Sequence, residues 1–108
     1  MSAAGLRRGE AAPATGDRPR RLADLRNVGK ATLADFRLLG VESLEQLRAC
    51  EPDALYVELQ ARTGQRQDPC VWDVFAAAIR QARTGEARDW WSFTPARKQS
   101  QAQGRFPA

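Results

Sequence analysis

The sequence predicts an all-α protein: a small five-helix domain that contains a helix-hairpin-helix, or SAM-like, arrangement and has disordered ends. Three observations support this fold class. Apolar residues between positions 22 and 82 recur at intervals of three and four, glycines stand where these periods end, and no segment has the pattern of a strand. The 108 residues can supply one compact domain, which we place at residues 22–95.

A tight turn follows the first predicted helical segment. This segment opens at Leu22 and ends in the tripeptide Asn-Val-Gly at residues 27–29, in which two residues that tolerate left-handed backbone flank one apolar residue. The next helix covers residues 30–39 and ends before Gly40, a common C-terminal cap. Its apolar side chains share one side: Leu33, Phe36 and Leu39.

Capping residues predict two further helices. Ser43, with Gln46 three residues later, forms the capping box of a short third helix. Pro52 suits the first turn of a fourth helix, which ends before Gly64. The apolar residues of these two helices recur at helical spacing: Leu44, Leu47, Leu55, Tyr56 and Leu59.

The fifth helix has the most regular pattern. Asp68 can cap it, Pro69 fits its first position, and Gly85 ends it. One buried stripe is expected through more than three turns: Val71, Val74, Phe75, Ala78, Ile79 and Ala82. We expect this helix to form the centre of the core.

Polar segments flank the domain. Residues 1–21 lack an apolar period and carry five arginines against Glu10 and Asp17, so we expect a disordered tail of charge +3. Residues 96–108 are polar, and we expect a second disordered tail. No apolar run reaches the roughly 18 residues that span a bilayer, and the N-terminus lacks the apolar stretch of a secretory signal. We therefore expect a cytoplasmic protein without a membrane partner.

Charge is distributed unevenly within the domain. Arg26, Lys30 and Arg37 outnumber the acidic residues around them, whereas residues 41–60 hold five carboxylates against Arg48 alone. A polyanion would be attracted to the first half and repelled by the second.

The tight turn carries the first candidate site. In a helix-hairpin-helix motif, the turn and the start of the second helix present unpaired backbone amides at the positive end of the helix dipole, where a phosphate oxygen can bind. Such contacts hold the DNA backbone and read no base sequence. The candidate phosphate-binding residues, by amide or by charge, are Val28, Gly29, Lys30, Ala31, Arg26 and Arg37.

The same residues also have an ordinary structural interpretation. Short helix pairs joined by a glycine turn form protein–protein modules as well, and a lysine at the start of a helix is often only solvated. Asn27 stands where many DNA-binding hairpins have another glycine, although asparagine tolerates the left-handed region. From the sequence, both interpretations stay open.

A second candidate site lies after the fifth helix. Trp90, Trp91 and Phe93 stand between two arginines, and aromatic faces in such a setting can stack on unpaired bases or contact a protein partner. We favour a structural role, in which the tryptophans fold back on Trp72 and on the second face of the fifth helix and complete the core, because so small a chain rarely leaves two tryptophans in water.

The sequence contains no recognisable catalytic or metal-binding pattern. Cys50 and Cys70 are too few for a disulfide framework, and without any histidine a zinc site lacks ligands and Cys70 lacks a base. The neighbouring Asp68 and Asp73 oppose formation of a thiolate. We therefore expect buried structural thiols and a non-enzymatic protein without cofactor, metal or small-molecule substrate.

Three segments resemble the pathogenicity-locus family of small bacterial proteins, often called mitomycin resistance proteins: "LRNVGKATLADFRLLGVESLEQL", "DALYVELQARTGQRQDPCVWDVFAAAIRQA" and "WWSF". The resemblance covers residues 22–95, and DPCVWDVF is its most specific part. It implies a helix-hairpin-helix-like domain in a bacterial cytoplasm, a setting of DNA-damage tolerance, and no defined mechanism. A histidine frequently precedes Asp-Pro-Cys in the family, and Gln67 occupies that place here.

Two function classes follow. In the first, the protein is a non-catalytic DNA-binding module that contacts phosphate weakly and without sequence preference. In the second, it is an adaptor whose acidic helices or tryptophan-rich segment bind a protein partner. A positive surface around Lys30 would favour the first class, and an exposed patch at Trp90 and Trp91 the second.

Overall fold

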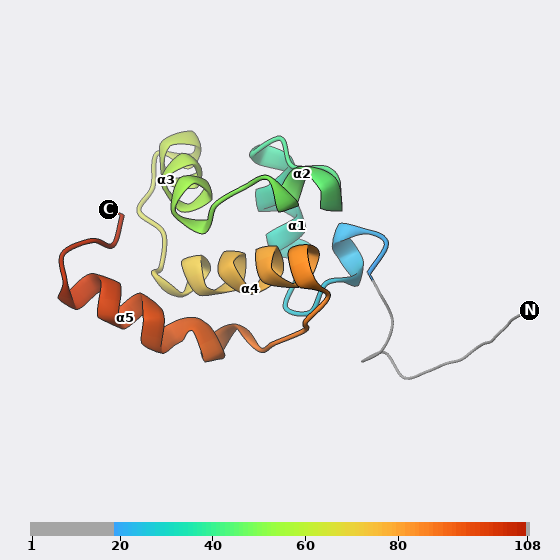
Figure 1. Ribbon diagram of the computed structural model, residues 1–108. Coiled ribbons are helices and arrows are strands. Elements are labelled where there is room, and N and C mark those ends of the chain that lie inside the picture. Colours follow the sequence, from blue (N-terminus) through green and yellow to red (C-terminus); the bar gives the residue numbers. More distant parts are fainter. Residues whose placement is uncertain (1–18, 108) are drawn as a thin grey trace, which may run out of the picture.

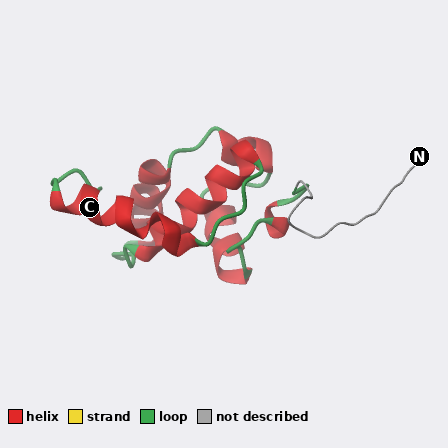
Figure 2. Cartoon of the chain, turned by 60° about the horizontal axis from the view of Figure 1, so that its bottom comes forward, coloured by secondary structure: helices red, strands yellow, loops and turns green. Residues whose placement is uncertain are grey.

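The computed structural model describes residues 19–107, so most of the predicted N-terminal tail lies outside the described residues. Within this part, five α-helices and two 3₁₀ segments follow one another without a strand, which confirms the all-α class (Figures 1 and 2). The 3₁₀ segment η2 (Leu22–Asp24) and helix α1 (Lys30–Leu38) enclose the predicted tight turn. Gly40, at a φ of +79°, follows the end of α1.

The capping residues begin and end the next two helices as predicted. Helix α2 (Leu44–Arg48) begins where the Ser43 hydroxyl accepts the Gln46 amide at 3.1 Å. The Gln46 side chain accepts the amide of Glu42 at 2.6 Å, one residue before the partner that a standard capping box uses. Helix α3 (Pro52–Thr63) ends at Gly64, which adopts left-handed backbone.

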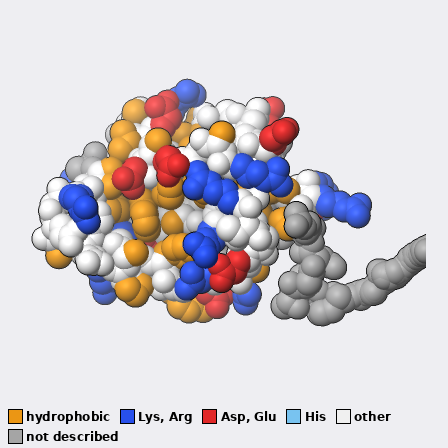
Figure 3. All heavy atoms as spheres, viewed as in Figure 1, with side chains coloured by type: hydrophobic (Ala, Val, Ile, Leu, Met, Phe, Trp, Pro, Cys, Tyr) orange, Lys and Arg blue, Asp and Glu red, His pale blue; other side chains and the backbone are white. Residues whose placement is uncertain are grey.

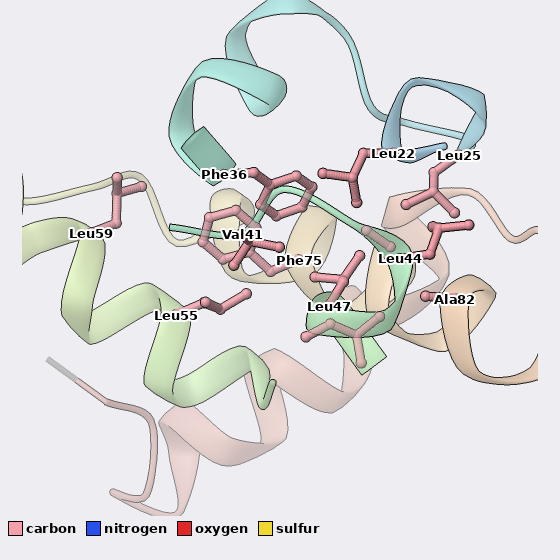
Figure 4. Close-up of a cluster of buried hydrophobic side chains, with 12 residues drawn as sticks. Leu22, Leu25, Phe36, Val41, Leu44, Leu47, Leu55, Leu59, Phe75 and Ala82 are labelled. Atoms are coloured by element: carbon pink, nitrogen blue, oxygen red, sulfur yellow. The ribbon is translucent and has the colours of Figure 1, made fainter. Parts of the chain in front are cut away.

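Helix α4 (Cys70–Thr84) begins one residue later than predicted, although Asp68 caps it by accepting the Cys70 amide at 2.8 Å. Most of the predicted stripe is buried, while Val71 and Val74 are only half-buried. The Phe75 ring stacks on that of Phe36 from α1, with centroids 5.6 Å apart (Figure 4). This stack lies within a cluster to which η2, α1, α2, α3 and α4 all contribute.

The C-terminal residues form a helix, so the predicted loose tail over residues 96–108 is wrong for most of its length. After the 3₁₀ segment η3 (Trp90–Phe93), helix α5 (Thr94–Ala102) lies against the side of α4 opposite α2 and α3 (Figure 1). Phe106 continues this packing, with its ring centroid 5.3 Å from that of Tyr56 and 6.1 Å from that of Trp72.

A buried ion pair fixes α5 to α4. Asp73 has no solvent exposure, and its two carboxylate oxygens accept Arg97 nitrogens at 3.1 and 3.2 Å. The Thr94 hydroxyl donates to the same carboxylate at 2.8 Å, and the Arg97 guanidinium donates further to Gln101 at 3.2 Å. The hydrogen bonds that Arg97 donates to Asp73 raise the pKa of Arg97, which therefore keeps its charge inside the domain. One polar residue thus anchors a helix that has almost no apolar pattern.

The core interpretation makes a prediction about Phe75. Phe75→Ala should lower the free energy of unfolding by about 3 to 5 kcal/mol, because it removes a fully buried ring from the cluster. Val57, which is 43 % exposed on α3, supplies the control, and Val57→Ala should change stability by less than about 0.5 kcal/mol. Urea denaturation followed by circular dichroism measures both. Equal midpoints for the two variants would contradict this placement of the core.

The ion pair makes a second prediction. Arg97→Met should cost about 3 to 5 kcal/mol, because it leaves the Asp73 carboxylate buried without a cation. Asp73→Leu combined with Arg97→Met should cost less than the single change, since no unpaired charge then remains in the interior. The same denaturation experiment compares the two proteins. A double variant less stable than Arg97→Met would show that the charge itself stabilises the fold.

Candidate nucleic-acid interface

The segment from Leu25 to Ala31, here called the entry turn, leads from η2 into α1. Its left-handed residue is Asn27, at a φ of +74°, the one non-glycine residue with positive φ in the described range. Gly29 has an extended φ of −108° and precedes the first residue of α1. Asparagine therefore makes the bend, and Gly29 is the residue from which the helix starts.

The backbone amides of the entry turn divide into two groups. The Val28 amide donates to the Leu25 carbonyl at 3.3 Å, so the prediction that it points outward unpaired is wrong: it closes the turn. The amides of Gly29, Lys30 and Ala31 have no acceptor among the described residues, because the first helical hydrogen bond runs from Leu33 to Gly29. All three of these residues are exposed. They form a short row of free donors at the positive end of the α1 dipole.

The three candidate cations near this row differ in what they already bind. Lys30 and Arg37 are exposed and have no carboxylate partner in residues 19–107. Arg26 instead pairs with Asp89 at 3.0 Å, and its amide donates to the buried Gln81 side chain at 2.8 Å. The structure therefore leaves Lys30 and Arg37 available to an anion and gives Arg26 a structural contact as well.

Asn27 joins the entry turn to the segment after α4. Its side-chain amide donates to the Arg88 carbonyl at 2.8 Å, and its side-chain oxygen accepts the Trp90 amide at 3.3 Å. In Figure 1 the two segments lie side by side at the C-terminal end of α4. The sequence predicts only that Asn27 replaces a glycine in the turn. In the structure Asn27 also joins two segments of the chain, and its hydrogen-bond partners lie more than 60 residues away, where no local pattern reveals them.

The segment η3, which carries the tryptophan pair, packs against α4 as predicted, but the pair does not pack on Trp72. Trp72 instead donates its indole N–H to Asp53 at 2.7 Å and contacts Phe106. Trp90 is half-buried and Trp91 is 59 % exposed, with their rings edge to face and their centroids 5.7 Å apart. The Arg88 guanidinium lies 5.3 Å from the centroid of the Phe93 ring, a cation–π contact. An aromatic surface therefore stays open beside the segment that Asn27 holds.

Many of the other arginines are engaged within the fold. Arg48 donates to the Ala82 carbonyl at 2.7 Å, and Arg83 donates back to the Arg48 and Cys50 carbonyls at 3.0 and 2.6 Å. Each of these arginines thus caps the C-terminal end of the other's helix. On the face shown in Figure 3, basic side chains lie next to acidic ones and form no uniform positive surface.

The cysteines have the environment of structural thiols. Both are free and half-buried, somewhat more open than the predicted buried state. Burial raises the pKa of Cys50 and of Cys70, and the Asp68 carboxylate raises that of Cys70 further. No group of three or more potential metal ligands occurs in residues 19–107. The helices of this range are also too short or too polar to cross a bilayer.

The fold and this surface define a small all-α domain with an exposed helix start and a partly exposed aromatic segment, Trp90–Phe93. The chain belongs to the pathogenicity locus family, whose model matches residues 15–99. It is 42 % identical over 77 residues, which are 71 % of this chain and 73 % of the relative, to the mitomycin resistance protein McrB of Streptomyces lavendulae. These comparisons confirm the predicted resemblance. No solved structure matches the chain.

The environment of the two thiols predicts that they are alkylated slowly at neutral pH. A raised pKa leaves less thiolate at pH 7 than a free cysteine has, so iodoacetamide should label Cys50 and Cys70 slowly in the native protein and faster as the pH rises. Cys50→Ala and Cys70→Ala each leave one thiol for separate measurement, and urea supplies the unprotected rate. Rapid native labelling of Cys70 at pH 7 would restore it as a candidate nucleophile.

Proposed function

We propose that the protein is a non-catalytic DNA-binding module that contacts backbone phosphate through the entry turn, in a helix-hairpin-helix manner. One observation carries the proposal: Gly29, Lys30 and Ala31 are exposed residues whose amides have no acceptor within residues 19–107, and Lys30 adds a positive charge to this segment. Free amides at a helix start form an anion site, and the helix dipole adds to its attraction. A phosphate group would satisfy all three donors.

Further cations lie on the same part of the chain. Arg37 is in the last turn of α1, about 10 Å along the helix from Lys30. It lines an open groove together with Arg21, which is paired with Asp24, and with Glu42. The pair between Arg26 and Asp89 is about half exposed, so it contributes little stability and leaves part of the Arg26 side chain open to solvent. With only these few charges, binding should be weak and indifferent to base sequence.

The relative's name supports a biological setting. That protein is called a mitomycin resistance protein, and it shares 42 % identity with this chain. We propose that this chain also acts in mitomycin or DNA-damage tolerance, in the bacterial cytoplasm. A phosphate-binding module would serve that role by holding damaged DNA.

An adaptor is the second candidate function. It is favoured by Trp91, whose 59 % exposure is high for so large a hydrophobic side chain. In this case the tryptophan-rich segment or the acidic helices would bind a protein partner, and the free amides of the entry turn would bind only water.

The decisive test is Lys30→Glu in the full chain, measured by fluorescence anisotropy with a short blunt duplex. The parent should bind with a logarithmic salt slope on the order of 2 to 4, which corresponds to a few neutralised phosphates. Lys30→Glu should abolish binding without lowering stability, because it places a negative charge at the anion site but suits the helix dipole.

Arg66→Glu is the matched control. Arg66 is exposed in the loop between α3 and α4, and the substitution changes the net charge by the same amount. It should reduce affinity only slightly. Equal losses for the two variants would mean that general charge is responsible, and an absence of binding at low salt would favour the adaptor.

A further inference from the structure

We propose that the groove beside Trp91 receives an unpaired base of the DNA strand that lies on the entry turn. The protein would then prefer ends or junctions, where duplex meets single strand, over continuous duplex. This inference rests on the proposed function, since the entry turn holds the adjoining backbone. It assigns the aromatic segment a ligand of defined chemistry: a flat nucleobase next to a phosphate.

The groove has the shape and lining for a flat ligand. It is a shallow, largely open groove of about 590 Å³, formed by η3 and the first turns of α5 together with Cys70 at the start of α4. Most of its surface is apolar, as stacking requires, and it is open on one side, so a base attached to a strand can enter without a change of fold.

Trp91 supplies the stacking platform. With 59 % of its surface exposed, at least part of its indole face is free, while the edge-to-face contact with Trp90 limits how the ring can turn. Trp90 is in turn held by the hydrogen bond from its amide to Asn27. An exposed but restrained ring loses little freedom when a base stacks on it.

The charges around the groove suit a polyanion. Its lining contains two cations and no carboxylate. Arg97 is neutralised by Asp73, which leaves Lys98, exposed and without a carboxylate partner in residues 19–107, to meet a phosphate. Of the carboxylates next to the lining, Asp89 is paired with Arg26, whereas Asp68 contacts the Cys70 thiol. An acidic peptide would also carry negative charge, but its acidic side chains have no flat ring that could stack on Trp91.

The entry turn is bonded to the segment that carries the tryptophans of the groove. Asn27 bonds directly to Arg88 and Trp90, and it precedes Gly29 by two residues, a path of at most about 7.6 Å between Cα atoms. A strand whose phosphate sits on the Gly29 amide can therefore place a base at the tryptophans within a few nucleotides. The two sites are close enough to act on one DNA molecule.

The experiment compares two DNA probes on the full chain. One is a blunt duplex, and the other is the same duplex with a single-stranded overhang of four thymines; fluorescence anisotropy gives both affinities. The parent should bind the overhang probe about tenfold more tightly, which is the size of effect expected when one base stacks on an aromatic ring. Trp91→Ala should remove this preference and leave the affinity for the blunt duplex unchanged, and Trp91→Phe should retain part of it.

Two further variants make the result specific. Val57→Ala alters an exposed apolar residue on α3 and should keep the full preference. Lys98→Glu should reduce the preference for the overhang, because it removes the free cation of the groove. A melting curve shows whether Trp91→Ala folds. If it does not fold, Lys98→Glu tests the groove in its place.

The outcomes separate this inference from the proposed function. If the blunt duplex binds through Lys30 but the overhang adds nothing, or adds the same to Trp91→Ala, the groove is not a base site and the proposed function stands. If the overhang probe binds through Trp91 while Lys30→Glu has no effect, the proposal that the entry turn binds phosphate is wrong, and the groove remains a base site. If neither probe binds at low salt, both proposals are overturned, and a protein partner becomes the occupant of the groove.

Discussion

Burial of α4 on two opposite sides determines the arrangement of the whole domain. One side carries Phe75 and Ile79 into the cluster formed with η2 and α1 to α3. The other side carries Asp73, which receives Arg97 and so fixes α5 and the segment before it. Ala76 and Ala77 are buried outside the main cluster, and their small side chains let neighbouring segments approach closely. Because so much of this helix is covered, the candidate sites lie mainly on the segments around it.

This arrangement brings together parts of the chain that are far apart in sequence. The entry turn precedes α1, while the aromatic segment follows α4, and Asn27 connects the two with hydrogen bonds to Arg88 and Trp90. The ion pair of Asp73 fixes the far end of the same segment. Trp91 is therefore exposed on a backbone that is held at both ends, a combination more suited to a binding surface than to a mobile tail.

Local signals made most of the fold predictable. The side chains of Ser43 and Asp68 cap helices within three residues of themselves, so short-range sequence patterns reveal them. Helix α5 escaped prediction because a single charged side chain, Arg97, attaches it to α4, and apolar periodicity cannot detect such an anchor. The sequence does not reveal that the Val28 amide closes the turn by bonding the Leu25 carbonyl, because this hydrogen bond depends on the backbone angles of the turn. The partners of Asn27 lie on the other side of the fold, where sequence reasoning has no access to them.

The distribution of free cations explains why net charge is a poor guide to the function of this chain. Arginines such as Arg48 and Arg83 cap helix ends, and Arg97 neutralises a buried carboxylate, so these charges serve the fold. Lys30 and Lys98, by contrast, have no carboxylate partner among the described residues, and one lies at each candidate site. In the proposed interface, affinity would come from a few charges combined with free amides and one aromatic face. Such an interface would respond to the local geometry of DNA more than to its length, because each kind of contact needs a different feature of the strand in the right place.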